Sequence, residues 1–255
     1  ARLDVRQTGT LPDRFSPDAT IMRIDVDKQE LQHSRVKCHI NIHADIKAFL
    51  LDLNAEINKK PRKDLSKWHE QITNWKNAFP LLFSHNSDIV KPQQVIDAVN
   101  RYSADRRVIV TSGVGSHQQW SARHFTFDYP KRIWLTSGGH GAMGYDLPSA
   151  IGAQLGKPDY LVISFIGDGS FQLNMQELQS VIEFGTPIKM FILDNRRLGL
   201  VSQFQLLNWQ SDPTTGDKVN PDFVKIAKAY GIKSYRLENV NMIEGVVRNA
   251  IEHDG

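Results

Sequence analysis

The sequence holds a single cysteine, no long apolar run and almost no surplus of charge of either sign. Because Cys38 has no second cysteine to pair with, an intrachain disulfide framework is excluded, and a reducing compartment, by default the cytoplasm, is expected. No apolar stretch approaches the roughly 20 residues that a membrane helix needs, and the first residues lack the pattern of a signal peptide. The 31 basic and 28 acidic residues leave a net charge of +3, which gives no electrostatic basis for binding nucleic acid or an acidic membrane.

What is present is an ordinary globular composition, with 40% hydrophobic and 23% charged residues in a chain of 255. This length allows one sizeable core and part of a second unit, so we expect one or two domains. The chain opens on Ala1-Arg2-Leu3-Asp4 without a methionine and closes on Gly255, a residue of the kind that usually precedes another strand. We therefore expect these residues to be a piece of a longer chain.

Residues 1–55 have the pattern of the last strand–helix units of an α/β domain. Residues 21–26 alternate and are rich in β-branched side chains, which predicts a strand. Apolar residues at helical spacing predict a helix over 45–53. The pattern then loosens over 56–91, which we interpret as a connector that contains a helix over 65–78.

From residue 92 to 255 the pattern alternates between helices and continuous apolar strands. Such strands are typical of a parallel sheet that is covered on both faces. Their alternation with helices predicts a doubly wound, mostly parallel α/β sheet in this second domain. The expected strands are 108–111, 133–135, 161–166, 188–193 and 233–237, and the expected helices are 94–102, 148–155, 175–184, 222–230 and one that starts at 242.

Polar residues directly follow the ends of two of these strands. Gly167-Asp168-Gly169-Ser170 follows 161–166, and Asn195 follows the next strand, 27 residues after Asp168. Because the carboxyl ends of parallel strands share one edge of the sheet, we expect these oxygens to lie together where such sheets bind ligands. An Asp, an Asn and a diphosphate would satisfy Mg²⁺, and the glycines would let backbone N–H groups approach phosphate. An isolated Gly-Asp-Gly-Ser is often only a turn, but the paired Asn favours the metal site.

Three other features allow simpler interpretations. Residues 139–144 match the Gly-x-Gly-x-x-Gly pattern of nicotinamide-binding folds, but nothing else in the sequence supports that cofactor. Cys38, His39 and His43 have zinc-like spacing, yet packing and surface positions explain them more simply. His140 fits a polar loop better than an active-site proton donor.

Several motifs together resemble one family, the large subunit of thiamine diphosphate-dependent acetolactate synthase (acetohydroxyacid synthase). That family carries Gly-Asp-Gly followed after about 24 to 27 residues by Asn-Asn. Ser112-Gly-Val-Gly-Ser-His-Gln-Gln-Trp120 and Thr136-Ser-Gly-Gly-His-Gly-Ala-Met-Gly-Tyr145 are similar to two further motifs of the family, and Leu198-Gly199 follows the metal Asn as it does there. The first nine residues are similar to a segment late in its central domain. The resemblance thus covers nearly the whole chain and implies its C-terminal part.

The resemblance implies a role for individual residues. Mg²⁺ would be held by Asp168, Asn195 and the backbone carbonyl of Arg197, and His117 and Ser170 would be among the residues on the diphosphate. Met143, which by residue type alone fits a core position, would support the bent cofactor. The full set implied for the thiamine cofactor is Ser116, His117, Gly141, Met143, Gly167, Asp168, Gly169, Ser170, Asn195, Leu198 and Gly199.

Two further sites follow from the resemblance. Asp4, Arg6 and Asp25 fall where the family contacts FAD, a cofactor that is structural there. Leu200 and Phe204 fall in the substrate pocket. The Glu that activates the cofactor would come from an N-terminal domain of a partner subunit, so no catalytic residue is assigned, and a homodimer or tetramer that shares the site is expected.

The sequence also departs from the family pattern. Phe204 stands where Trp is typical, which leaves the acceptor open. Val5 is found where the family has an Asp, Ser116 where it has a Gln that contacts the diphosphate, and Asp146 where it has a Gly. These differences leave open whether FAD is retained and how tightly the thiamine cofactor binds. Asp194 stands for the first Asn of Asn-Asn, which matters less because the second Asn carries the ligand.

The function implied is a carboligase that decarboxylates pyruvate and transfers the hydroxyethyl group to a carbonyl acceptor, as in branched-chain amino acid biosynthesis. Two alternatives stay open. The first keeps the cofactor in another lyase, a dione hydrolase or a carboligase with a keto-sugar acceptor. The second is a cofactor-binding subunit without catalysis.

Overall fold

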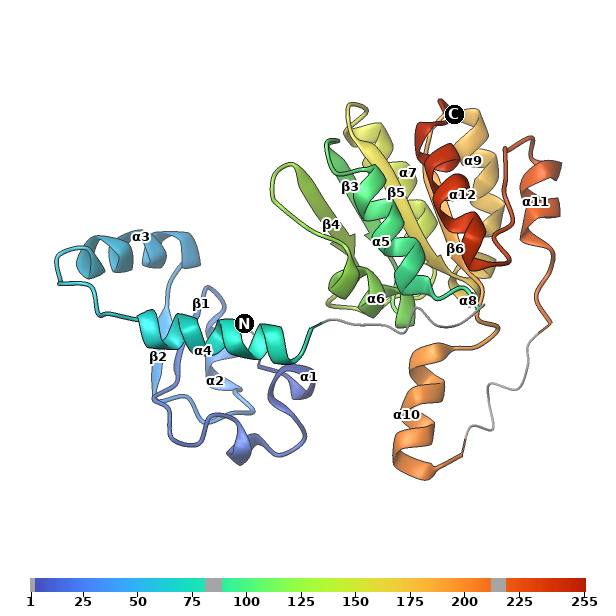
Figure 1. Cartoon of the computed structure of the whole chain (residues 1–255). Coiled ribbons are helices and arrows are strands. Elements are labelled where there is room, and N and C mark those ends of the chain that lie inside the picture. The colour runs from blue at the N-terminus through green and yellow to red at the C-terminus, as the bar shows by residue number, and fades with distance from the viewer. Residues whose placement is uncertain (1–2, 81–88, 212–218) are drawn as a thin grey trace. The chain divides into compact units, whose positions relative to one another are not determined.

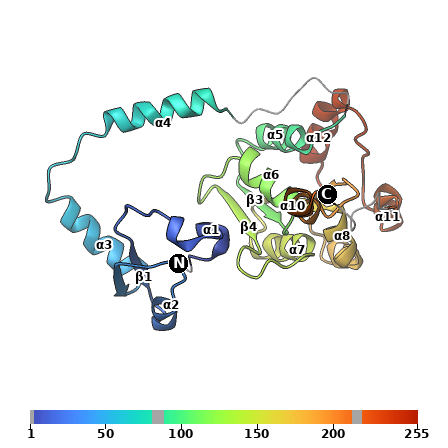
Figure 2. The same ribbon diagram turned by 90° about the horizontal axis from the view of Figure 1, so that it is seen from below.

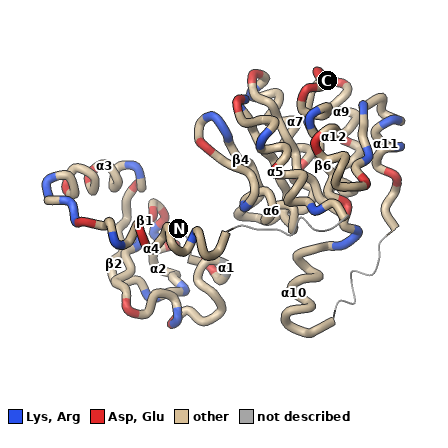
Figure 3. The backbone as a smooth tube through the Cα atoms, in the orientation of Figure 1, with Lys and Arg blue, Asp and Glu red and all other residues tan. Residues whose placement is uncertain are grey.

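The computed structural model describes residues 3–80, 89–211 and 219–255 (Figure 1). Contacts between Cα atoms divide the chain into two compact units, residues 1–79 and 80–255. Residues 81–88 of the predicted connector lie outside the described residues. None of the described helices is long and apolar enough to cross a membrane. Acidic and basic side chains are interspersed along both units, in line with the small net charge (Figure 3).

The first unit is built on two short parallel strands, β1 (Met22–Asp25) and β2 (Ile40–His43). Asp27 caps α2 and Asp45 caps α3, because each carboxylate accepts a backbone N–H of the first turn. The strand predicted over 21–26 and the helices predicted over 45–53 and 65–78 are confirmed. The helices of this unit are α1 (Val5–Thr8), α2 (Lys28–Gln32), α3 (Ile46–Ile57) and α4 (Ser66–Ala78), with a 3-10 turn at Pro12–Arg14.

The second unit is a parallel sheet of four strands in the order β4-β3-β5-β6. The chain starts at β3, adds β4 on one side and then β5 and β6 on the other, which is the doubly wound arrangement predicted from the sequence. The strands are β3 (Val108–Ser112), β4 (Arg132–Thr136), β5 (Leu161–Gly167) and β6 (Lys189–Leu193). The helices are α5 (Pro92–Tyr102), α6 (Ser116–His124), α7 (Asp146–Gly156), α8 (Asp168–Asn174), α9 (Leu178–Glu183), α10 (Gly199–Trp209), α11 (Phe223–Ala229) and α12 (Ile243–Glu252), with 3-10 turns at Met175–Glu177 and Val240–Met242.

Both faces of this sheet are buried under helices. Val108 and Val110 of β3 pack in a core with α5 and α12, whereas Ile109 between them packs in a second core with α7 and α9. This alternation follows from the period of two along a strand. Figure 2 shows α5 and α12 on one side of the sheet and α7 and α8 on the other. The carboxyl ends of the strands are thus held between two packed layers.

One predicted element of this unit is wrong, and three of its helices, α6, α8 and α10, were not predicted. Residues 233–237 form no strand. Residues 231–238 and β6 both line one groove of about 920 Å³, so the groove lies where hydrogen bonds between neighbouring strands would have to form. The helix α6 is too polar to show helical periodicity, and α10 carries apolar residues on every side, including Leu207 and Trp209, so neither has a clear amphipathic pattern.

Candidate functional site

A pocket of about 120 Å³ lies at the carboxyl ends of β5 and β6. The two strands pair in parallel with Gly167 opposite Leu193, so Asp168 and Asn195 leave the sheet at the same edge. Both residues line the pocket, as the sequence predicts. The predicted site residues found in its wall are Ser116, His117, Met143, Gly167, Asp168, Gly169, Ser170, Asn195, Arg197, Leu198, Gly199 and Leu200.

The other predicted site residues lie elsewhere. Gly141 forms a turn with a positive φ of 77° and donates its N–H to the carbonyl of Ser137, outside the pocket lining. Phe204 is 58% exposed on α10 and packs edge-on against Trp209 at 5.3 Å between ring centroids. The residues predicted for FAD belong to the first unit. Asp4 precedes α1, Arg6 lies within α1 and Asp25 ends β1, and the side chain of Arg6 is not among those that the structure describes.

Glycines let the backbone of this pocket come close to side chains that face it. A Cβ at Gly169 would lie 2.9 Å from Cε of Met143, and one at Gly167 would lie 2.8 Å from Nδ1 of His117. Met143 is 40% exposed and reaches the pocket, so the core position suggested by its residue type is wrong. Backbone N–H groups at the start of α8 therefore remain accessible from the pocket, as an anionic group would require.

The oxygen atoms predicted to hold a metal are partly engaged with neighbours. Asp168 is buried, and its Oδ2 accepts a hydrogen bond of 2.6 Å from Nδ2 of Asn220, which also donates to Oδ1 of Asp194 at 2.7 Å. Oδ1 of Asn195 accepts the backbone N–H of Arg197 at 3.1 Å. All of these acceptors are hard oxygen atoms, the type that Mg²⁺ prefers. These oxygen ligands therefore fit Mg²⁺, although one carboxylate oxygen of Asp168 is hydrogen-bonded to Asn220.

Asn220 was not identified from the sequence. It lies 52 residues after Asp168, just before α11, and no motif or spacing connects the two. Only the folded chain brings this amide to the edge of the sheet.

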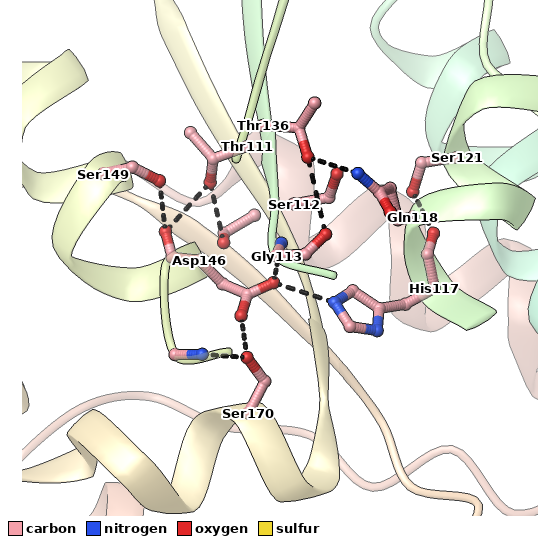
Figure 4. A network of polar contacts seen from close by, with 12 residues as sticks. Thr111, Ser112, Gly113, His117, Gln118, Ser121, Thr136, Asp146, Ser149 and Ser170 are labelled. Atoms are coloured by element: carbon pink, nitrogen blue, oxygen red, sulfur yellow. Dashed lines mark hydrogen bonds and ion pairs between the residues drawn. The ribbon is translucent and has the colours of Figure 1, made fainter. Parts of the chain in front are cut away.

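Behind the pocket, Asp146 is the centre of a buried polar network (Figure 4). Its Oδ1 accepts the backbone N–H of Gly113 and lies 3.0 Å from Nε2 of His117. Its Oδ2 accepts the hydroxyl of Ser170, whose oxygen in turn accepts the N–H of Gly144 at 2.8 Å. The network thus joins the ends of β3 and β5 to the starts of α6 and α7.

The backbone of Asp146 is anchored as well. Its carbonyl accepts the hydroxyl of Ser149 at 2.9 Å and lies 3.2 Å from Oγ1 of Thr111. Thr111 on β3 also contacts Ser164 on β5, 2.8 Å between hydroxyl oxygens, across the sheet register. Asp146 was noted from the sequence only as a departure from a Gly. Its type and position at the start of a helix gave no sign of this network.

The zinc-like spacing near Cys38 does not make a metal site in the part of the chain that the structure describes. The thiol of Cys38 contacts Ser34, Nδ1 of His39 accepts the N–H of Ile21, and His43 bonds to the carbonyl of Val26. No group of three or more His, Cys, Asp or Glu side chains there could hold an ion. His140 lies exposed in a turn, as its polar loop pattern predicts.

The chain is similar to known proteins along its whole length. Residues 113–255 match the family described as thiamine pyrophosphate enzyme, C-terminal TPP binding domain. The chain is 36% identical to the acetolactate synthase catalytic subunit, mitochondrial, of Saccharomyces cerevisiae, 35% to acetolactate synthase 2, chloroplastic, of Nicotiana tabacum and 35% to the acetolactate synthase large subunit of Porphyra purpurea. Each alignment covers 100% of this chain but 38%, 39% and 43% of the respective relative. The chain therefore spans about two fifths of the length of these relatives.

Proposed function

The chain belongs to the thiamine pyrophosphate enzymes, and from that premise we propose that its pocket binds thiamine diphosphate with Mg²⁺ in a carboligase of the acetolactate synthase type. One observation carries the proposal. The pairing of Gly167 with Leu193 brings Gly167-Asp168-Gly169-Ser170 and Asn195 into the wall of one pocket at the carboxyl edge of the sheet.

The metal would be held by Asp168, Asn195 and the backbone carbonyl of Arg197, together with diphosphate oxygens. Mg²⁺ usually takes one or two protein groups plus phosphate, so this small set is sufficient. Binding through Oδ2 of Asp168 requires that carboxylate to exchange the amide of Asn220 for the metal. The role of the metal is to orient the diphosphate rather than to create a nucleophile.

The chemistry that thiamine diphosphate supplies when bound is a nucleophilic carbon that takes up pyruvate, releases CO₂ and passes the remaining two-carbon unit to a carbonyl acceptor. The chain itself contributes positioning and exclusion of water. Met143 reaches the pocket beside Gly169 and would support the cofactor, and Leu200 lines the side toward the substrate. Phe204 packs on Trp209 outside the pocket lining. The acceptor would therefore be selected by Leu200 and by other parts of the complete protein.

Further parts of the proposal concern the whole protein. FAD would contact Asp4, Arg6 and Asp25. The activating Glu would come from a partner subunit in a homodimer or tetramer. The cytoplasm stays the predicted compartment, although one of the relatives is named as mitochondrial and another as chloroplastic.

The test removes one metal ligand from the complete protein. Asp168→Ala should abolish Mg²⁺-dependent binding of thiamine diphosphate in calorimetry, whereas Asp159→Ala, an exposed carboxylate paired with Arg107, should not change it. Unchanged binding by Asp168→Ala would refute the metal assignment.

A second candidate keeps the cofactor and changes the reaction to that of another lyase, a dione hydrolase or a keto-sugar carboligase. It is motivated by the exposed Phe204 and by the buried carboxylate of Asp146. Product analysis with pyruvate alone separates the two, because accumulation of acetolactate excludes the hydrolase. A complete protein that binds the cofactor and turns over no 2-oxo acid would instead be a non-catalytic subunit.

A further inference from the structure

A buried carboxylate stands directly behind the pocket proposed to hold a diphosphate. Asp146 is the first residue of α7 and is fully buried. It is in contact with two residues of the pocket wall, His117 and Ser170. A second negative charge beside an anion site weakens binding through Coulomb repulsion, so its presence there calls for a physical explanation.

The carboxylate is bound by the protein as an anion would be. A carboxylate oxygen only accepts hydrogen bonds, so the backbone N–H of Gly113, the Nε2–H of His117 and the hydroxyl of Ser170 all donate to it. The start of α7 adds the favourable end of a helix dipole. These four contributions compensate the cost of burying the charge.

The hydroxyl of Ser170 is therefore committed. It has one hydrogen, which it donates to Asp146, and its oxygen accepts the N–H of Gly144 at 2.8 Å. It has no hydrogen left to donate to a phosphate in the pocket. Ser170 can contact such a group only through its backbone N–H at the start of α8.

The imidazole of His117 is committed in the same way. Its Nε2–H is directed to Asp146, so the atom toward the pocket is Nδ1, next to Gly115 and Gly167. With Nε2–H directed to Asp146, an anion in the pocket meets only the Nδ1 side of the ring. Asp146 thus determines which atom of His117 an anion meets.

We propose that the carboxylate of Asp146 acts as an internal anion that takes the side-chain donors of His117 and Ser170 away from the pocket, so that the pocket holds a diphosphate through backbone N–H groups and the metal. Asp146 is in this sense a positioning residue that lowers the affinity for the anion. The inference rests on the proposed function only in the choice of diphosphate as the natural ligand.

The experiment measures binding of inorganic pyrophosphate without Mg²⁺ to the complete protein by calorimetry. Asp146→Asn keeps the shape, removes the charge and turns an amide toward Ser170, whose hydrogen is then free. Asp146→Gly removes the group altogether. Both variants should bind pyrophosphate about tenfold more tightly than the wild type. Asp159→Asn, which removes an exposed charge, should bind as the wild type does.

The sign of the effect separates this role from a structural one. If Asp146 only stabilised the pocket, both variants would bind more weakly, and equal or weaker binding by Asp146→Asn overturns the proposal. Ser170→Ala supplies a second measurement. It should change pyrophosphate affinity less than twofold in the wild type but reduce it about fivefold in Asp146→Asn, because only there is the hydroxyl available. Equal effects in both backgrounds contradict the proposal.

The proposed function and the role of Asp146 can be refuted independently of each other. A wild-type protein that does not bind thiamine diphosphate with Mg²⁺ removes the proposed function and leaves the pyrophosphate result intact. A wild type that binds the cofactor, with variants no tighter than it, removes only the role of Asp146.

Discussion

The side-chain amide of Asn220 lies 2.6 Å from Oδ2 of Asp168, and the same amide donates to Asp194. One neutral side chain thus bridges two carboxylates at the edge where a cation is expected. Hydrogen bonds to charged groups are stronger than those between neutral groups, so Asn220 stabilises this edge in the absence of a metal.

Asn220→Asp should make the second unit depend on a divalent cation. Three neighbouring carboxylates repel one another, and an ion such as Mg²⁺ neutralises them. We expect a lower melting temperature than that of the wild type in a chelator and a larger upward shift on addition of Mg²⁺, both measured by thermal unfolding. Asn208→Asp on the exposed face of α10 is the matched control: it loses its hydrogen bond to the carbonyl of Phe204 and so also has a lower melting temperature, but it should respond to Mg²⁺ as the wild type does. A variant that responds to Mg²⁺ no more than the wild type contradicts the metal assignment.

Gly169→Ala should weaken cofactor binding with little effect on folding. The new methyl group would lie 2.9 Å from Cε of Met143, the flexible end of a side chain, which can move but then fills pocket space. We expect at least a tenfold loss of thiamine diphosphate affinity in calorimetry, with a free energy of unfolding within about 1 kcal/mol of the wild type.

Gly152→Ala on α7 is the control for that substitution. No heavy atom lies within 4 Å of its added Cβ, and Ala favours a helix over Gly. It should raise the free energy of unfolding by about 0.5–1 kcal/mol and leave binding unchanged. Equal binding losses in the two variants would rule out a local effect at Gly169.

Phe165→Ala should destabilise the second unit strongly. Phe165 is fully buried on β5, two residues before the strand ends at Gly167, and its ring lies 5.7 Å from that of Phe191. Removing such a side chain leaves a cavity, and we expect a loss of about 3–5 kcal/mol in urea unfolding. Phe184→Ala, at an exposed position, should change stability by no more than about 0.5 kcal/mol.

Glu244→Gln should reduce stability near neutral pH but not in acid. Hydrogen bonds from Arg101 and then from Tyr102 lower the pKa of Glu244 below its usual value. A lowered pKa contributes stability above the pKa of the unfolded chain, and this contribution is lost as the pH falls through the folded pKa. Because these side chains are half exposed, the expected loss at pH 7 is about 0.5 kcal/mol.

Chemical unfolding at a series of pH values tests this contact between α5 and α12. The difference between Glu244→Gln and the wild type should begin to shrink as the pH falls below about 4.3, the usual pKa of a glutamate, and should vanish only below the lowered pKa of Glu244 in the folded protein. A difference that persists in acid would mean that the carboxylate charge is not the cause. Glu238→Gln, at an exposed position 3.9 Å from Arg236, should behave as the wild type at every pH.

The parts of the fold predicted correctly are those that a local pattern determines. Continuous apolar runs revealed β5 and β6, and the residues that end them, Asp168 and Asn195, revealed the pocket. The error at 233–237 has a different origin, because a strand also needs a neighbour, which no local pattern contains. Asn220 escaped prediction for the same reason, since its contact with Asp168 exists only in the folded chain. Asp146 shows the limit most clearly, because the donors to its carboxylate come from residues 113–117 and from Ser170, two segments that only the folded chain brings together.

The division of the chain into two units gives its one thiol a practical use. Cys38 is half buried in the first unit, whereas the pocket belongs to the second. A thiol-reactive fluorophore would attach at this one position and leave the pocket wall chemically untouched. Its emission would follow unfolding of the first unit alone, whereas the intrinsic tryptophan signal reports both units, because Trp68 and Trp75 lie in the first and Trp120 in the second. A denaturation midpoint of the fluorophore that differs from that of the tryptophans would show that the two units unfold separately.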